Sequence, residues 1–329
     1  MTTTRYEWTL LRAGRFLLDG GGMFGVIPRS VWTRVATPDE HNRIELQHNC
    51  LLLTGGGRTV LIEAGTGDKL DAKMSGIFGL DGTTVESAVA DAGTDPAEVN
   101  AVIVSHMHFD HAGGLTRRAR AGETPDWVAG PGEASGDQDE VCLTFPNAEV
   151  IVQRREWTDA INNDAVMTRT YYRDHLLPLN ARPITLERPR VRQIESPIPF
   201  PLDHTPHRNE RPRAPIHNRR TEVLPGIHVF LVPGHTWGQQ AVMFSDTQGR
   251  TIVFTPDLLP TRWHIGQAYS LSYDVEPYTS MVTKRWFLEA AVEHGWQLLL
   301  DHEPGDPLAR VAPNERGWFD LSDPGPEQV

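Results

Sequence analysis

The chain has 329 residues, with 31 basic and 43 acidic side chains, and its formal net charge is −12. With 39% hydrophobic and 22% charged residues, it has the composition of a soluble globular protein. A negative net charge argues against nonspecific nucleic-acid binding because phosphates would be repelled, so we expect no nucleic-acid partner. The only cysteines are Cys50 and Cys142, which excludes a disulfide scaffold and a cysteine-based zinc ribbon.

The sequence predicts neither a membrane span nor an exported protein. No stretch reaches the roughly 18 consecutive apolar residues that a span needs, so we expect no membrane contact. Residues 1–16 lack the apolar core and small-residue cleavage site of a signal peptide. Two lone thiols also fit a reducing compartment, and we therefore expect a cytoplasmic location.

Short apolar runs alternate along the chain with amphipathic stretches typical of helices. Residues 49–65 predict two strands joined by a glycine turn, and residues 83–92 predict a helix. Residues 154–177 predict one long polar helix. Residues 279–294 predict a further helix that ends at Gly295.

Residues 181–220 differ from the rest of the chain in composition. They hold nine arginines, eight prolines and four acidic residues, which gives a net charge of +5. Proline at this density excludes a regular helix or a central strand. Two interpretations stay open, an ordered lid or subunit contact and a mobile solvated insertion. We expect a single domain over residues 1–329 that carries this insertion, and the sequence leaves open whether the protein forms a homodimer.

Four apolar runs predict buried strands that each end at a candidate ligand. The runs are residues 101–104, 227–232, 251–254 and 296–300, and they are followed by His106, His235, Asp257 and the pair Asp301 and His302. Open α/β sheets bind ligands at the carboxyl ends of their strands. We therefore expect these side chains to converge on one point.

The first ending, SHMHFDHAGG (residues 105–114), holds three imidazoles and a carboxylate within six residues. His106 and His108 are two residues apart and face the same side of an extended segment, and Asp110 and His111 follow at a turn. Imidazoles crowded in this way would repel one another on protonation, which favours a role in metal binding. Nitrogen and oxygen ligands without thiolate suit zinc, iron, manganese or cobalt.

The string HMHFDH resembles the H-x-H-x-D-H signature of the metallo-β-lactamase superfamily. The later strings PGHTWG (233–238), TPD (255–257) and LLLDH (298–302) resemble its other metal motifs, in the same order. The spacing is similar to that of the lactonase-like branch, which includes acyl-homoserine lactonases and methyl parathion hydrolase. The resemblance implies an α/β fold, an αβ/βα sandwich of two mixed β-sheets flanked by helices.

The resemblance also implies a dinuclear metal site. One ion would be bound by His106, His108 and His235, the other by Asp110, His111 and His302, and Asp257 would bridge the two. The ions would be two divalent metals, zinc first, with manganese, cobalt or iron as alternatives. A hydroxide shared by the ions would attack the substrate. Asp110 would be the catalytic residue that orients the hydroxide and accepts its proton.

Three positions depart from the pattern of the family. Glu63 replaces an Asp found in many relatives and is expected to accept a hydrogen bond; Gln239 replaces a histidine and is expected to give support without being a ligand. Pro260 occupies the position of a tyrosine that contacts substrate oxygens in acyl-homoserine lactonases.

A substrate pocket is implied by the same resemblance. Residues 19–28 resemble an early hairpin that borders the site, and further aromatic candidates lie near the ligand motifs. The candidate pocket residues are Met23, Phe24, Trp237, Trp263 and His264. For each of them, an ordinary place in the core is the alternative.

These features predict a metal-dependent hydrolase that opens lactones or cleaves esters of a small-molecule substrate. The alternative is a phosphotriester or aryl-ester hydrolase on the same site, which the missing tyrosine and the aromatic candidates favour. An iron-dependent redox enzyme is a weaker alternative, because such relatives lack some ligands of the second metal or need a flavin-binding domain. A noncatalytic binding protein would be expected to have lost ligands, and this chain keeps all of them.

Overall fold

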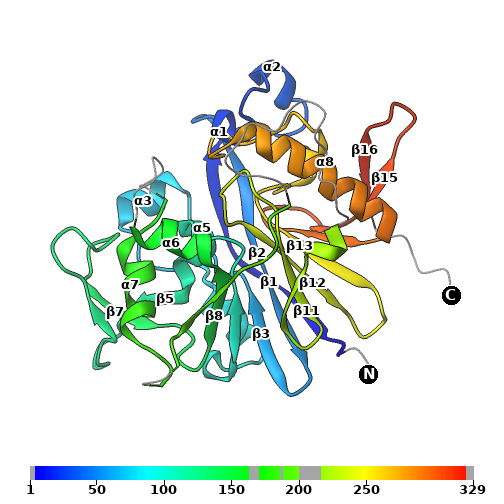
Figure 1. The fold of residues 1–329 in the computed structure, drawn as a ribbon. Coiled ribbons are helices and arrows are strands. Elements are labelled where there is room, and N and C mark those ends of the chain that lie inside the picture. The colour runs from blue at the N-terminus through cyan, green and yellow to red at the C-terminus, as the bar shows by residue number, and fades with distance from the viewer. Residues whose placement is uncertain (1–3, 163–169, 186–187, 200–215, 324–329) are drawn as a thin grey trace. The chain divides into compact units, whose positions relative to one another are not determined.

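The computed structural model describes residues 4–162, 170–185, 188–199 and 216–323. The chain divides into two compact units (Figure 1). Unit 1 consists of Met1–Tyr6, Leu18–Leu46 and Glu195–Val329, and unit 2 consists of Glu7–Leu17 and Gln47–Ile194. The single domain expected from the sequence stays a prediction.

Unit 2 is built on a mixed six-stranded sheet of order β1-β2-β3-β4-β8-β9. The strands are β1 (Glu7–Asp19), β2 (Arg43–Gly55), β3 (Arg58–Ile62), β4 (Ala101–Ile103), β8 (Glu149–Gln153) and β9 (Val191–Ile194). β2 and β3 are antiparallel, whereas β3, β4, β8 and β9 run parallel, so the carboxyl ends of these four strands share one edge of the sheet. A smaller sheet has the order β5 (Thr116–Arg118), β7 (Glu140–Leu143) and β6 (Trp127–Val128).

The helices of unit 2 are short. They are α3 (Ala72–Ile77), α4 (Val85–Asp91), α5 (Phe109–Ala112), α6 (Arg154–Asn162) and α7 (Arg173–Ala181), with the 3₁₀ helices η1 (Pro96–Glu98) and η2 (Gly113–Leu115). α4 begins at a capping box in which Thr84 and Ser87 exchange hydrogen bonds, and it confirms the helix predicted for residues 83–92.

The single helix predicted for residues 154–177 is wrong. Residues 170–172, between α6 and α7, are not helical. Tyr171 is buried there, and its hydroxyl donates a hydrogen bond to Glu156. Packing of this aromatic side chain overrides the helical pattern of the surrounding polar residues.

Unit 1 is built on a mixed seven-stranded sheet in which the strands follow one another in chain order. They are β10 (Thr221–Leu224), β11 (Ile227–Leu231), β12 (Gln240–Ser245), β13 (Thr251–Thr255), β14 (Gln297–Leu300), β15 (Leu308–Pro313) and β16 (Phe319–Ser322). All neighbours are antiparallel except β13 and β14, which are parallel. It follows that β11, β13 and β14 point the same way, and their carboxyl ends lie at one edge of the sheet.

The helices of unit 1 include one long helix, α8, which lies across the sheet (Figure 1). The helices are α1 (Gly20–Phe24), α2 (Arg29–Trp32), α8 (Pro277–His294) and the 3₁₀ helices η3 (Ile216–Arg219) and η4 (Arg262–Ile265). α8 ends where predicted, at Gly295, whose φ of 63° is left-handed. Its Phe287 and Ala291 pack with Phe230 and Leu298 of the strands in one hydrophobic core.

Most of the predicted elements are confirmed. The four apolar runs form β4, β11, β13 and β14, and residues 49–65 hold β2 and β3 around a glycine turn. The expected α/β class with two mixed sheets is confirmed. β9 falls within residues 181–220 but is the last strand of its sheet, as the prolines require. Residues 186–187 and 200–215 lie outside the described residues, so the role of the insertion stays a prediction.

Within the part of the chain that the structure describes, no helix combines the length and the apolar character needed to cross a membrane.

Candidate metal centre

The segment after β4 brings three histidines of unit 2 together. Nε2 of His106 lies 3.0 Å from Nδ1 of His108, and the ring centroids of His106 and His111 are 4.0 Å apart. All three side chains are buried. A positive charge on any of these rings would be costly at this burial, so the arrangement suits neutral imidazoles that bind a cation.

Glu63, which follows β3, contacts this segment at its start and at its end through its two carboxylate oxygens. Its Oε1 accepts a hydrogen bond of 2.6 Å from the backbone N–H of Ser105, and its Oε2 lies 3.2 Å from Nδ1 of His111. An acceptor at Nδ1 keeps the proton there and gives Nε2 the lone pair that a metal ligand needs. The hydrogen-bonding role expected for Glu63 is confirmed. Its φ of 68° is left-handed, which is uncommon for a residue other than glycine.

Asp110 lies in the first turn of α5 and is buried. Its Oδ2 is 3.8 Å from Nε2 of His111, the ring nitrogen that faces away from Glu63. Among the described residues, the groups whose ligand atoms lie within 4.8 Å of one another do not include Asp110, so its role as a metal ligand stays a prediction. The catalytic role of Asp110 stays a prediction.

In unit 1, Asp257 lies between two histidines that follow other strands. Its Oδ2 is 3.0 Å from Nε2 of His235, and its Oδ1 is 3.3 Å from Nε2 of His302. A carboxylate that faces two imidazoles with different oxygens fits the bridging role. Asp301 is a further candidate that the ligand assignment did not include, since Asp257, Asp301 and His302 offer atoms within 4.8 Å of one another.

Asp274 is a partner of His235 that the sequence analysis missed. Its Oδ1 lies 2.9 Å from Nδ1 of His235, so it fixes the ring and leaves Nε2 on the side of Asp257. Burial alone would lower the pKa of His235, but Asp257 and Asp274 outweigh burial and raise that pKa to about 10. A single acidic residue in a loop before α8 gives no spacing signal by which it could have been found.

Glu156 in α6 is a second missed residue. It is fully buried, and its Oε1 accepts a hydrogen bond of 2.9 Å from the backbone N–H of Met107, between His106 and His108. Only the packing of α6 against the segment reveals this contact, because Glu156 belongs to an otherwise polar helical stretch.

The two other departures from the family pattern have structural roles. Gln239 is buried and donates a hydrogen bond of 3.3 Å to the carbonyl oxygen of Val232. The carbonyl oxygen of Pro260 accepts a hydrogen bond of 3.0 Å from the backbone N–H of His302. Pro260 therefore helps to place a candidate ligand but presents no hydroxyl group.

Four of the five candidate pocket residues, Met23, Phe24, Trp263 and His264, lie together in unit 1. Met23, Phe24 and His264 are buried, whereas Trp237 and Trp263 are half-buried. The structure brings three of the rings together, since Phe24 stacks on His264 at 4.9 Å between centroids and its centroid is 6.4 Å from that of Trp263. The role of these side chains as substrate contacts stays a prediction.

His264 ties this group to α1. Its Nε2–H donates to the carbonyl oxygen of Met23 at 2.8 Å, and its Nδ1 accepts from the hydroxyl of Thr261 at 2.8 Å. Burial lowers the pKa of His264 to about 3, so the ring is neutral at physiological pH. Phe24 also stacks on Trp32, with centroids 5.2 Å apart.

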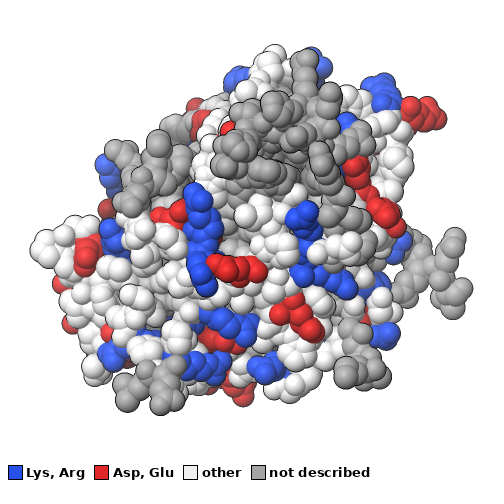
Figure 2. Space-filling view, in the orientation of Figure 1, with Lys and Arg blue, Asp and Glu red and all other residues white. Residues whose placement is uncertain are grey.

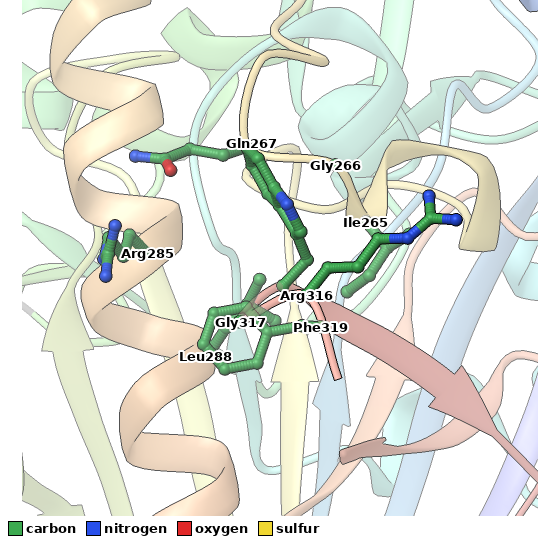
Figure 3. A pocket seen from close by; sticks show the side chains of 9 residues that line it. Ile265, Gly266, Gln267, Arg285, Leu288, Arg316, Gly317 and Phe319 are labelled. Atoms are coloured by element: carbon green, nitrogen blue, oxygen red, sulfur yellow. The ribbon is translucent and has the colours of Figure 1, made fainter. Parts of the chain in front are cut away.

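A separate cavity of about 180 Å³ lies between η4, α8 and the turn from β15 to β16 (Figure 3). Ile265 and Leu288 give it an apolar lining, and Arg285, Arg316 and Trp318 add charge and aromatic surface. The candidate ligands of unit 1 do not line it, so this cavity is distinct from the ligand cluster.

The donor set of both units fits divalent metal ions. Imidazole nitrogens and carboxylate oxygens without thiolate suit zinc, manganese, cobalt or iron. His111 and His235 each have a carboxylate at Nδ1, which is the usual support of a metal-binding histidine. The chemistry of the residues therefore agrees with a site for divalent ions.

Comparisons with known proteins found both a relative in sequence and similar solved structures. The N-acyl homoserine lactonase AttM of Azorhizobium caulinodans is 39% identical over 71 residues, which cover 18% of this chain and 27% of that enzyme. A probable metal-dependent hydrolase from Staphylococcus aureus has a TM-score of 0.71 at 23% identity, covering 99% of this chain and 100% of that one. AidC, a dizinc quorum-quenching lactonase, has a TM-score of 0.67 at 16% identity, covering 100% and 97%.

These similarities differ in what they establish. The chain spans about a quarter of the lactonase AttM, and the two solved structures, at low identity, show a shared fold. The family model of the metallo-beta-lactamase superfamily, in contrast, matches residues 43–292, which is well over half of the chain. Together with the α/β fold and the buried His and Asp clusters, this match shows that the chain belongs to the metallo-beta-lactamase superfamily.

Proposed function

We propose that the protein is a dinuclear metal-dependent hydrolase that opens lactones or cleaves esters of a small molecule. The observation that carries the proposal is the position of Asp257, whose two carboxylate oxygens face His235 and His302. A buried carboxylate between two imidazoles is poorly explained by stability alone, because removing three polar groups from water costs free energy. Binding of cations would offset that cost.

In this proposal, the ligands of both units bind the same two ions, an assumption that rests on membership of the family. His106, His108 and His235 would hold one ion, Asp110, His111 and His302 the other, and Asp257 both. Zinc is the proposed metal, since AidC is a dizinc enzyme, with manganese, cobalt or iron as alternatives.

The chain's own residues would position the reacting groups. When bound, the ions would supply Lewis acidity and a nucleophile near neutral pH. Asp110 would accept the proton of the attacking water at its carboxylate and pass it to the leaving oxygen. Glu63 and Asp274 would hold the protons on Nδ1 of His111 and His235, and so keep both rings in a fixed orientation.

Lactones are the preferred substrate class because AttM and AidC are both lactonases. A phosphotriester or aryl ester is the second candidate. It is favoured by Pro260, which presents no hydroxyl to a lactone.

The proposal is tested by hydrolysis assays on protein loaded with zinc, manganese or cobalt, and on a chelated control. Acyl-homoserine lactones, simple lactones, aryl esters and a phosphotriester are compared by kcat/KM. A lactone preference of about 100-fold, or about 2.7 kcal/mol of transition-state binding, would support the lactonase assignment. A phosphotriester-led profile would support the second candidate. Oxygen uptake by iron-loaded protein, without hydrolysis, would refute both in favour of redox chemistry.

A small-molecule substrate, a cytoplasmic location and the absence of nucleic-acid and membrane partners remain part of this proposal. On the face shown in Figure 2, basic and acidic side chains of the described residues are intermixed.

A further inference from the structure

Lys69 is a buried lysine in the loop after β3 of unit 2. Its side chain is 3% exposed, and its ammonium donates hydrogen bonds of 2.6 Å to the carbonyl oxygens of Gly113 and Thr116. Both carbonyls follow His111 within a few residues. Lysine is almost never buried to this extent without a specific partner, so these two contacts need an explanation.

Backbone hydrogen bonds connect the loop that contains Lys69 to the histidine segment and to the residues just after it. The backbone N–H of Ala64 donates to the carbonyl oxygen of His111 at 2.9 Å, and that of Gly114 donates to the carbonyl oxygen of Gly65 at 2.9 Å. Lys69 adds two side-chain hydrogen bonds, one to Gly113 in η2 and one to Thr116 just after η2. The histidine segment is therefore held at its C-terminal end by a side chain as well as by the backbone.

The surroundings of Lys69 offset only part of the cost of its burial. The guanidinium of Arg118 donates to the carbonyl oxygen of Lys69 at 3.1 Å, which fixes the backbone of the loop. Burial lowers the pKa of Lys69 to about 8, against the attraction of Asp174 and Asp68. A neutral amine still has two N–H donors for the two carbonyl acceptors, so the hydrogen bonds survive loss of the charge.

We propose that Lys69 is a positioning residue of the metal site, which holds the segment of residues 106–111 in its ligand-binding conformation by clamping the carbonyls of Gly113 and Thr116. This inference rests on the proposed function, since it assumes that the side chains of this segment bind metal. A segment that is ordered in advance loses less conformational entropy when its ligands bind an ion. Loss of the clamp is therefore expected to weaken metal binding.

The test is the variant Lys69→Met, which keeps an unbranched apolar side chain but removes the donors. Metal-free protein is titrated with Co²⁺, and visible absorption gives both the affinity and the coordination geometry without any substrate. We expect the Co²⁺ affinity to fall about 10-fold, at the lower end of the range for direct partners of metal ligands, because Lys69 acts on the ligands through the backbone. Far-UV circular dichroism checks that the variant is folded at the temperature of the titration.

Arg190 provides a matched control in unit 2. It is also buried, and its guanidinium donates to the carbonyl oxygens of Arg182 at 2.8 Å and Ala148 at 2.7 Å. Arg190→Met should also lower the melting temperature, because it removes the donors to two backbone carbonyls, yet leave the Co²⁺ affinity within about threefold of wild type, because neither carbonyl belongs to the histidine segment. An equal loss of affinity in both variants would overturn the inference, and so would wild-type affinity in folded Lys69→Met.

If Lys69→Met does not fold, hydrogen exchange on the metal-free wild-type protein decides the question. Amides of residues 106–116 should be protected before any metal is added. Protection that appears only with Co²⁺ would refute the inference. Wild-type protein that binds Co²⁺ but hydrolyses no substrate would refute the proposed activity alone, whereas failure to bind Co²⁺ would refute both.

Discussion

The two units supply their candidate ligands in different ways. In unit 2, all of them come from one continuous segment, residues 106–111, whose shape is set by a loop and its hydrogen bonds. In unit 1, they follow β11, β13 and β14, and the register of the sheet brings them together. Local hydrogen bonds therefore control one set of ligands, and the packing of a whole sheet controls the other.

The largest loss of metal and of activity is expected from Asp257→Ala in unit 1. His106→Ala in unit 2 is the variant with which it is compared. Asp257 contacts two histidines, so its loss should lower the content of both metals, whereas His106→Ala should chiefly deplete one. We expect kcat/KM to fall by more than about 100-fold in both variants, since removal of a partner of a ligand already costs about 10- to 100-fold. Metal analysis and steady-state kinetics measure the two effects.

The control for this pair is His41→Ala, because the side chain of His41 is 67% exposed. It should retain metal and activity. If Asp257→Ala behaves like His41→Ala, the ligand assignment in unit 1 is wrong.

A smaller effect is expected when the carboxylates behind the histidines are neutralised. Asp274→Asn in unit 1 and Glu63→Gln in unit 2 should each lower Co²⁺ affinity by about 10- to 100-fold. The fall in Co²⁺ affinity for Glu63→Gln should be nearer 10-fold, because an amide oxygen can still accept the hydrogen bond from the backbone N–H of Ser105. Equal, wild-type affinities in both would show that these carboxylates do not orient the rings.

The buried lysines Lys69 and Lys284 should make the free energy of unfolding depend on pH in the alkaline range, which surface lysines with ordinary pKa values would not do. Burial lowers the pKa of Lys284 from 10.5 to about 8, so between these values the unfolded chain binds more protons than the folded chain. The free energy of unfolding contributed by this group should therefore rise with pH over that range. Because Lys69 has the same shift, Lys284→Met should remove about half of the combined effect.

Urea unfolding of metal-free protein at several pH values between about 8 and 10.5 measures this slope. A slope unchanged by Lys284→Met would show that its amine is not buried in solution as it is in the structure.

The smallest effect is expected at the cavity of Figure 3. Trp318, one of the lining residues, is 53% exposed at the turn between β15 and β16. Trp318→Ser should change the free energy of unfolding by no more than about 0.5 kcal/mol and leave kcat/KM within about twofold. A larger loss of kcat/KM would show that this cavity contributes to the activity.

The contrast between the units also explains what could be predicted from the sequence. The histidine segment was recognisable because its ligands lie within six residues, and the ligands of unit 1 were found because each follows an apolar strand. Asp274 and Lys69 were missed because their partners are distant in the sequence. The break between α6 and α7 was missed because it depends on where Tyr171 packs, which no local pattern records.

The stack of His264, Phe24 and Trp32 has a consequence for how such enzymes diverge. Its rings lie nearly parallel, with interplanar angles of 7° and 8°, so Phe24 is in contact with a ring on each face. Replacement of Phe24 alone would remove a stacking contact from both Trp32 and His264. The changes in the free energy of unfolding caused by substitutions at the three positions should therefore not be additive. Descendants of this protein are expected to exchange the three rings together, because an intermediate that replaces a single ring loses contacts that the other two rings cannot restore.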